Sequence, residues 1–206
     1  MLDVRDLSCS RGDRTLFQAL SFTLPPGTLL SVTGENGSGK TTLLRALCGL
    51  SPVDRGSISW QGRRIADAQQ GYREQLAYLG HRNALKDDLS PIENLQAMAC
   101  IFGQNLDPGS AESALHAVGL GRSCHILATR LLSEGQKRRV ALARFWSCER
   151  PLWILDEPFT ALDANSSRLL RNRLERHLTN RGIVVVATHE EIGIGAGTVQ
   201  QLRLPG

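Results

Sequence analysis

Hydrophobic and polar positions alternate in the first part of the chain. Residues 2–7 and 16–24 place apolar side chains at every second position, and Gly12 and the Pro25-Pro26-Gly27 turn mark their ends. A period of two is typical of strands with one face toward water. We therefore expect an antiparallel sheet at the N-terminus.

Three later segments are short and almost continuously apolar instead: residues 28–34, 152–157 and 182–189. Runs of this kind are typical of strands buried on both faces of a parallel sheet. Helical patterns separate them, so the fold class we expect is α/β with a mostly parallel core sheet.

The chain between residues 82 and 147 is mainly helical in pattern. Ser90 is placed to cap a helix that begins at Pro91, and two further helices are expected after it. The three predicted helices are 90–102, 107–118 and 134–147. We expect one domain over 1–206, with a core from 1–81 and 148–206 and an inserted helical subdomain at 82–147.

Composition narrows the class of protein. With 206 residues, of which 41% are hydrophobic, the chain is long enough for one well-buried core. No apolar run approaches the roughly 18 residues of a membrane span, and the first ten residues lack the apolar core of a signal peptide, so we expect a cytoplasmic protein. Five scattered cysteines without a C-x-x-C pair indicate neither a disulfide framework nor a zinc site.

The stretch GENGSGKT fits the phosphate-binding pattern G-x-x-x-x-G-K-[ST] and lies between a predicted strand and a predicted helix. Backbone N–H groups there can surround a triphosphate, Lys40 can reach its outer phosphates, and the Thr41 hydroxyl can coordinate Mg²⁺. Lys40 is one of only three lysines among 24 cationic residues, which makes a chance match less credible. The predicted ATP-binding residues are Gly34, Glu35, Asn36, Gly37, Ser38, Gly39, Lys40 and Thr41.

Two adjacent carboxylates end the strand LWILDE. Asp156 fits the Asp that holds Mg²⁺ in P-loop NTPases. Glu157 points elsewhere because successive strand residues diverge, and it can act as the general base toward water. The strand 182–189 ends at His189, whose imidazole can contact the γ-phosphate or the water and bridge to Glu157.

The segment LLSEGQKRRVALARFW, residues 131–146, allows two interpretations. Ser133 and Gln136 can form a capping box at the start of a helix. The same helix start can instead face a phosphate.

Taken together, these motifs resemble those of the nucleotide-binding subunits of ATP-binding cassette (ABC) transporters. GENGSGKT is similar to the family's P-loop, LSEGQ to its signature, LWILDEP to its acidic strand, ALD (161–163) to its dimer-contact loop and His189 to its switch histidine. The resemblance implies that two copies face head to tail. Ser133, Gly135 and Gln136 of one copy would then close over ATP held by the other, while the capping box remains compatible with the empty state.

Three positions depart from the family pattern. Glu134 replaces the first signature glycine, and we expect its carboxylate to point outward, away from polyphosphate. Arg11 stands near the position of the aromatic residue that stacks on adenine, and its guanidinium plane can stack in its place. His81 replaces a glutamine that touches Mg²⁺ or water, so the resemblance makes it a candidate metal ligand beside Thr41 and Asp156.

Three segments are similar to the heme-exporter ATPase (CcmA) family of bacterial cytochrome c maturation: YLGHRNALKDDLSPIENL, RVALARFW and LWILDEPFTALD. This resemblance implies a membrane permease subunit of the CcmB type, other cytochrome c maturation proteins as partners, and a peripheral place on the cytoplasmic face of the inner membrane. It leaves heme export and heme release from a chaperone as alternatives.

Other function classes remain as alternatives. They are an ABC ATPase for another cargo, a nucleic-acid-associated ABC protein, a direct heme-binding protein and an inactive regulatory cassette. We expect no nucleic acid partner, because nucleic-acid-associated members usually have tandem cassettes or long insertions. No C-x-x-C-H is present for heme, and the presence of Glu157 and His189 disfavours an inactive cassette.

Overall fold

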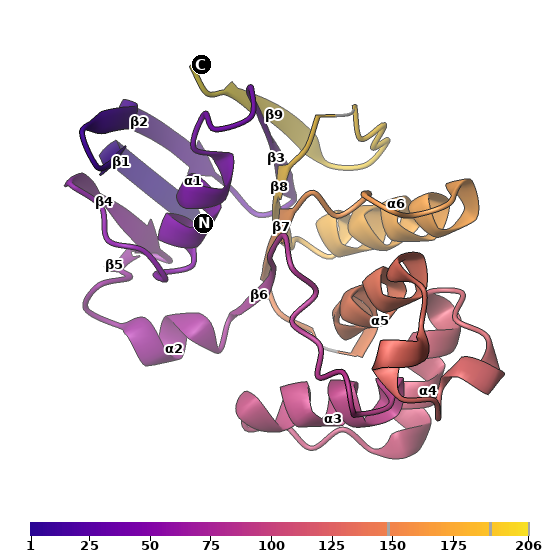
Figure 1. Ribbon diagram of the computed structural model, residues 1–206. Helices are drawn as coiled ribbons and strands as arrows, with labels where there is room; N and C mark the ends of the chain where they lie inside the picture. Colours follow the sequence, from indigo (N-terminus) through magenta and orange to yellow (C-terminus); the bar gives the residue numbers. More distant parts are fainter. Residues whose placement is uncertain (148, 190, 206) are drawn as a thin grey trace. The chain divides into compact units, whose positions relative to one another are not determined.

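The computed structural model describes residues 1–147, 149–189 and 191–205 (Figure 1). The chain forms two compact units. The first unit comprises residues 1–81, 150–158 and 174–206, and the second comprises 82–149 and 159–173. Residues 159–173 thus group with the helical segments, whereas the sequence pattern assigned them to the core. Among the described residues, no helix is both long and apolar enough to cross a bilayer.

The first unit contains the expected antiparallel sheet at the N-terminus. Its strand order is β2-β1-β4-β5. Gly12 adopts a φ of +60° in the turn between the first two strands, where a side chain would be strained. The strands are β1 (Leu2–Arg11), β2 (Arg14–Leu24), β4 (Arg55–Trp60) and β5 (Arg63–Arg64).

The first unit also contains a five-stranded parallel sheet, in the order β6-β7-β8-β3-β9. Its three inner strands correspond to the continuous apolar runs, and β7 and β8 are buried throughout. This confirms the α/β class. The strands are β3 (Thr28–Thr33), β6 (Leu76–Leu79), β7 (Leu152–Asp156), β8 (Ile183–Ala187) and β9 (Thr198–Arg203). Because the strands are parallel, their carboxyl ends meet at one edge, where ligands bind in such sheets.

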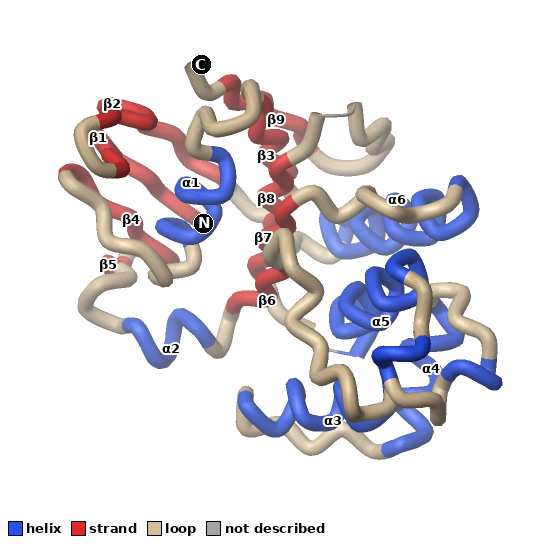
Figure 2. The backbone as a smooth tube through the Cα atoms, in the orientation of Figure 1, coloured by secondary structure: helices blue, strands red, loops and turns tan. Residues whose placement is uncertain are grey.

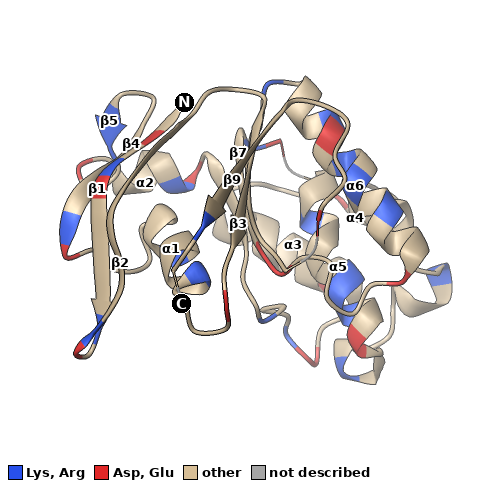
Figure 3. Ribbon diagram, turned by 90° about the horizontal axis from the view of Figure 1, so that it is seen from above, with Lys and Arg blue, Asp and Glu red and all other residues tan. Residues whose placement is uncertain are grey.

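Helix α1 (Lys40–Leu47) lies between the antiparallel and the parallel sheet (Figures 1 and 3). Its Leu43, Leu44 and Leu47 are completely buried in a core that takes side chains from both sheets. Burial of this apolar surface fixes the helix start at the end of β3. The short α2 (Gln69–Arg73) completes the helices assigned wholly to this unit.

The second unit is built from helices (Figure 2). Ser90 caps the first of them through a capping box with Glu93, and Pro91 occupies the first helical position, as expected. Asp107 caps the next through the backbone N–H of Ser110. The elements are α3 (Pro91–Ile101), α4 (Pro108–Ala117), the 3₁₀ turns Arg122–Cys124 and Thr129–Leu131, and α5 (Glu134–Ser147). Helix α6 (Ala164–Thr179) begins in this unit and ends in the first.

A buried amide holds the loop that precedes α3. The Asn94 side chain is 4% exposed and accepts a hydrogen bond from the Lys86 backbone N–H at 2.7 Å. Its Nδ2 lies 3.0–3.2 Å from the carbonyl oxygens of Lys86, Leu89 and Ser90 and from Thr129 Oγ1. The Thr129 hydroxyl in turn donates to the Leu89 carbonyl at 2.6 Å. These bonds tie residues 86–90 to α3 and to the segment before α5.

Candidate functional site

The glycine-rich stretch forms the connection from β3 to α1. Gly39 precedes the helix with φ of +98° and has no side chain to accept hydrogen bonds from the first turn. A Cβ on it would lie 3.0 Å from Leu16 Cβ, and a Cβ on Gly34 would lie 2.6 Å from Ser38 Oγ. Since no acidic residue occupies the first turn of α1, this helix start is open to an anion.

Two polar side chains of this loop are buried within it. Lys40 is 8% exposed, and its ammonium donates to the carbonyl oxygens of Gly34 at 2.8 Å and Glu35 at 3.1 Å. Ser38 is 2% exposed, and its hydroxyl has no hydrogen-bond partner in the described part of the chain. A buried hydroxyl of this kind costs free energy unless it is paired. The donor set therefore fits the phosphate groups of a nucleotide.

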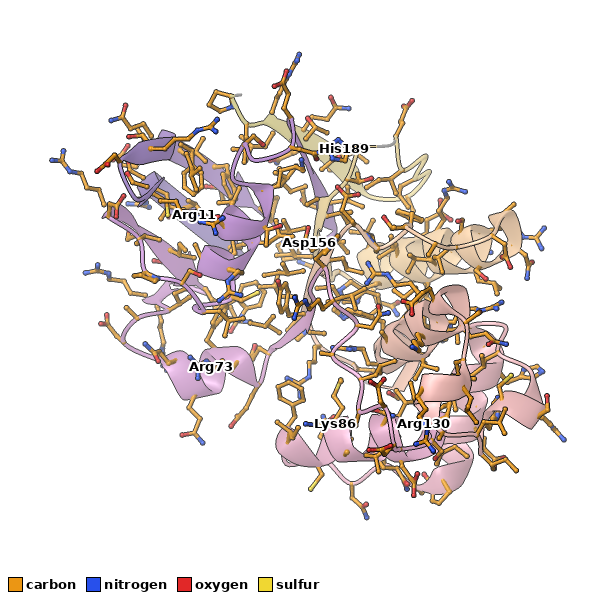
Figure 4. All side chains as sticks on the ribbon, viewed as in Figure 1. Arg11, Arg73, Lys86, Arg130, Asp156 and His189 are labelled. Carbon is orange, nitrogen blue, oxygen red and sulfur yellow. The ribbon has the colours of Figure 1, made fainter. Side chains whose placement is uncertain are left out.

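Thr41 and Asp156 come together although 115 positions separate them in the sequence. The Thr41 hydroxyl donates to Asp156 Oδ2 at 2.8 Å. Asp156 is 2% exposed at the end of β7, near the centre of Figure 4. A hydroxyl and a carboxylate are hard oxygen ligands, which Mg²⁺ prefers. Thr41 and Asp156 therefore fit a magnesium ion that keeps other positions for water and phosphate.

Glu157 turns away from Asp156 through its backbone conformation. Its φ is +48°, and its N–H donates to the Ala187 carbonyl at the end of β8 at 2.9 Å. Glu157 Oε1 lies 3.4 Å from His189 Nε2. Burial raises the pKa of this carboxyl, and the nearby charges of His189 and Lys40 oppose that rise. A carboxylate with a raised pKa beside an imidazole can accept a proton more readily than an exposed one.

His81 and Arg11 stand apart from these contacts. His81 is exposed in the segment that follows β6, and its charge is the weakest of the influences on the pKa of Glu157. Arg11 is exposed at the end of β1, beside the hairpin turn (Figure 4). The role of His81 as a metal ligand and the role of Arg11 in stacking on adenine remain predictions.

The signature residues lie in the second unit, at the start of α5. The Ser133 N–H donates to Gln136 Oε1 at 2.8 Å, and the Gln136 N–H donates to Ser133 Oγ at 3.3 Å, which is the expected capping box. Gln136 Nε2 also donates to Cys124 Sγ at 3.4 Å. The Glu134 side chain is 77% exposed and pairs with Lys137, in agreement with the expected outward direction.

Gly135 approaches the dimer-contact loop closely. A Cβ at this position would lie 2.9 Å from the Ala161 carbonyl oxygen, closer than real Cβ atoms come. Ala161 itself has φ of +64°. The second glycine of the signature is therefore required by the backbone of residues 161–163.

Sequence patterns missed two arginine contacts in this region. Arg138 Nη1 donates to Asn83 Oδ1 at 3.0 Å, and Arg139 Nη1 lies 3.6 Å from Asp163 Oδ2. Arg138 is 4% exposed. Charged residues on a helix face that is otherwise apolar were the available signal, but their partners depend on how the helix packs.

Comparisons with known proteins agree on one family. The model of the family described as ABC transporter matches residues 17–160. The cytochrome c biogenesis ATP-binding export protein CcmA of Dechloromonas aromatica is 49% identical over 99% of this chain and 100% of its own length. The protein of the same name from Nitrosospira multiformis is 47% identical over 97% of this chain and 96% of its own.

Solved structures agree on the fold. The structure of a dimeric bacterial ABC transporter cassette superposes with a TM-score of 0.86 and 20% identity, and it covers 98% of this chain and 94% of its own. At this identity the likeness concerns the fold, and it confirms the cassette architecture expected from the sequence.

Proposed function

The chain belongs to the ABC transporter family, among the cytochrome c biogenesis ATP-binding export proteins, and from this premise we propose how its residues divide the work. It is the ATP-hydrolysing subunit of a transport system for c-type cytochrome biogenesis. The observation that supports this most directly is the meeting of Lys40, Thr41, Asp156, Glu157 and His189 around the carboxyl ends of β3, β7 and β8. A nucleic-acid-associated role is not favoured, because the relatives that match over nearly the whole chain carry the cytochrome c biogenesis name.

ATP binds with its phosphates at the start of α1. The backbone N–H groups of the glycine-rich loop and the Ser38 hydroxyl donate to phosphate oxygens. Lys40 exchanges the carbonyl oxygens of Gly34 and Glu35 for the outer phosphates, which are better partners for an ammonium group. Thr41 and Asp156 hold Mg²⁺, which neutralises charge on the phosphates when bound.

Hydrolysis uses the carboxylate of Glu157. It accepts a proton from a water molecule whose oxygen forms a bond to the γ-phosphorus, while the bond from that phosphorus to the β-γ bridging oxygen breaks and ADP leaves. His189, 3.4 Å from Glu157 Oε1, orients the carboxylate and donates toward the γ-phosphate. The energetic contribution is positioning and charge stabilisation rather than covalent catalysis.

A second copy of the chain completes the site. Ser133, Gly135 and Gln136 present a helix start that is capped in the isolated chain. Its partial positive charge suits a γ-phosphate held by the other copy. The dimeric cassette with the same fold supports this arrangement.

The partner at the membrane is a permease subunit of the CcmB type, with other cytochrome c maturation proteins, and the chain lies on the cytoplasmic face of the inner membrane. The second unit supports a docking role because it exposes large apolar side chains. Ile101 is 79% exposed, Ile126 79% and Leu131 66%. Heme export and release of heme from a chaperone both remain compatible with these features.

The test is Glu157→Gln at the native locus, with Glu74→Gln as the matched control. Glu74 is an exposed carboxylate at the end of α2, so its change removes the same charge without touching the site. We expect Glu157→Gln to abolish ATP hydrolysis and covalent heme staining of membrane proteins, while other heme proteins persist and the control behaves as wild type. Normal heme staining in Glu157→Gln cells that contain the variant protein would contradict the cytochrome assignment. Unchanged hydrolysis by the purified variant would contradict the role of Glu157.

A further inference from the structure

Helix α5 carries an arginine that reaches the dimer-contact loop, residues 161–163. Arg139 Nη1 lies 3.6 Å from Asp163 Oδ2 and 3.5 Å from Ser166 Oγ. The Arg139 side chain is 21% exposed, whereas the side chain of Asp163 is 61% exposed. Both residues belong to the second unit, so the contact lies within one compact body.

The other carboxylate oxygen of Asp163 fixes the end of this loop to the start of α6. Its Oδ1 accepts the backbone N–H of Ser166 at 2.7 Å and thereby caps the start of α6. These hydrogen bonds, and more weakly the charge of Arg139, lower the pKa of Asp163. The carboxylate thus stays ionised and keeps one oxygen for the helix and the other for the arginine.

The loop contacts the signature at a second point. The Ala161 carbonyl lies so close to Gly135 that a Cβ there would be 2.9 Å away. Residues 161–163 therefore lie against the first two turns of α5, closely packed at Gly135 and paired in charge at Arg139. Figure 3 marks the positions of the charged residues along the ribbon of α5 and α6.

We propose that Arg139 is a positioning residue that joins the dimer-contact loop to the signature helix, so that both meet a second copy as one preformed surface. This inference rests on the proposed function, because it concerns the ATP-bound dimer. Pre-ordering of a loop lowers the entropy that association must overcome. Arg139 need not touch nucleotide or water to act in this way.

The experiment measures the ATP-dependent dimer in a Glu157→Gln parent, which binds but does not hydrolyse ATP. Dimer dissociation constants are obtained by analytical ultracentrifugation with ATP and Mg²⁺, and nucleotide affinity of the monomer is measured separately. The variants are Arg139→Gln, Asp163→Asn and the double change. Asparagine at 163 can still cap α6 but lacks the charge that attracts Arg139. Arg168→Gln is the matched control, because Arg168 is exposed and donates a hydrogen bond to Asn165 rather than to the loop.

A partly exposed ion pair changes an equilibrium by about 1.4- to fivefold, and a symmetric dimer contains the pair twice, so the dissociation constant should rise by about two- to twenty-fivefold. The nucleotide affinity of the monomer should stay within about twofold of the parent's. The double variant should dimerise no more weakly than the weaker of the two single variants, because both changes remove the same contact. Arg139→Lys, which keeps the charge, should recover part of the loss.

A dimer dissociation constant of Arg139→Gln equal to that of the parent would overturn the proposal. It would also be overturned if the dissociation constant of the double variant rose by the product of the two single effects. Should Arg139→Gln fold poorly, the exposed Asp163→Asn gives the same decision alone. If the Glu157→Gln parent itself fails to dimerise with ATP, the dimer in the proposed function fails together with this inference. The two failures are distinguished because the absence of an ATP-dependent dimer is already seen in the Glu157→Gln parent, whereas failure of the Arg139 proposal is seen only when Arg139 is changed.

Discussion

Replacing Asn94 by Ala removes the amide that holds residues 86–90. An asparagine has two N–H donors and one carbonyl acceptor, so the four oxygens near Nδ2 share two full hydrogen bonds. With the bond from the Lys86 N–H, three bonds are lost. At about 1 kcal/mol for each, the free energy of unfolding should fall by about 3 kcal/mol. For a chain of this length that corresponds to a melting temperature lower by about 6 to 12 °C.

Asn172→Ala is the matched control for this change. Asn172 is exposed on α6, so the same substitution is made in a helix without loss of a buried network. The gain in helix propensity is common to both sites and cancels in the comparison. We expect the control to change stability by less than about 0.5 kcal/mol. The assay is thermal and urea unfolding of the two variants beside the wild type. Equal melting temperatures for Asn94→Ala and Asn172→Ala would refute the argument that the buried amide stabilises this loop.

Three further predictions concern the site. Because burial raises the pKa of Glu157 above 4.5, the carboxylate takes up its proton at a higher pH than an exposed one. While ATP stays bound, single-turnover hydrolysis should therefore decline on acidification with a midpoint above the ordinary pKa of a glutamate side chain, and a midpoint at or below that value would contradict this. Gly135→Ala should lower the melting temperature. Displacing the Ala161 carbonyl costs about 1–3 kcal/mol, which outweighs a gain in helix propensity of up to about 1 kcal/mol. Gly71→Ala should raise the melting temperature, because a Cβ at Gly71 has no atom within 4 Å. Thr41→Ala should raise the Mg²⁺ concentration needed for half-maximal hydrolysis by about tenfold or more, with ATP binding in the absence of Mg²⁺ as the control.

Much of the fold could be predicted because its inner elements repeat a simple pattern. The continuous apolar runs became β3, β7 and β8, and the capped segments became α3, α4 and α5. β9 (Thr198–Arg203) was missed because it lies at the edge of the sheet and has polar side chains at four of its six positions. β4 (Arg55–Trp60) is an inner strand of its sheet, and it was missed because only Ile58 and Trp60 of it are buried. An edge strand is defined by its partner, which a single segment does not reveal.

The site divides in the same way. Thr41 and Asp156 could be placed together from the sequence because each ends or follows a recognisable buried strand. The contact between Arg139 and Asp163 could not, because it depends on the direction in which one helix presents its side chains to a distant loop. The assignment of residues 159–173 to the second unit has the same origin. Local pattern marks α6 as one helix, whereas packing divides it between two bodies.

The position of β3 has a consequence for biosynthesis. Leu29 pairs with Val184 on one side and Val199 on the other, so the strand that leads into the glycine-rich loop waits for partners from the far end of the chain. At about 5 to 20 residues per second, translation of the intervening sequence takes roughly 8 to 30 s. Until then the nascent chain holds an apolar strand with both edges unpaired, which exposes it to chaperones and to aggregation. A nascent chain that ends before β8 therefore lacks the strand that pairs with β3 and also lacks His189.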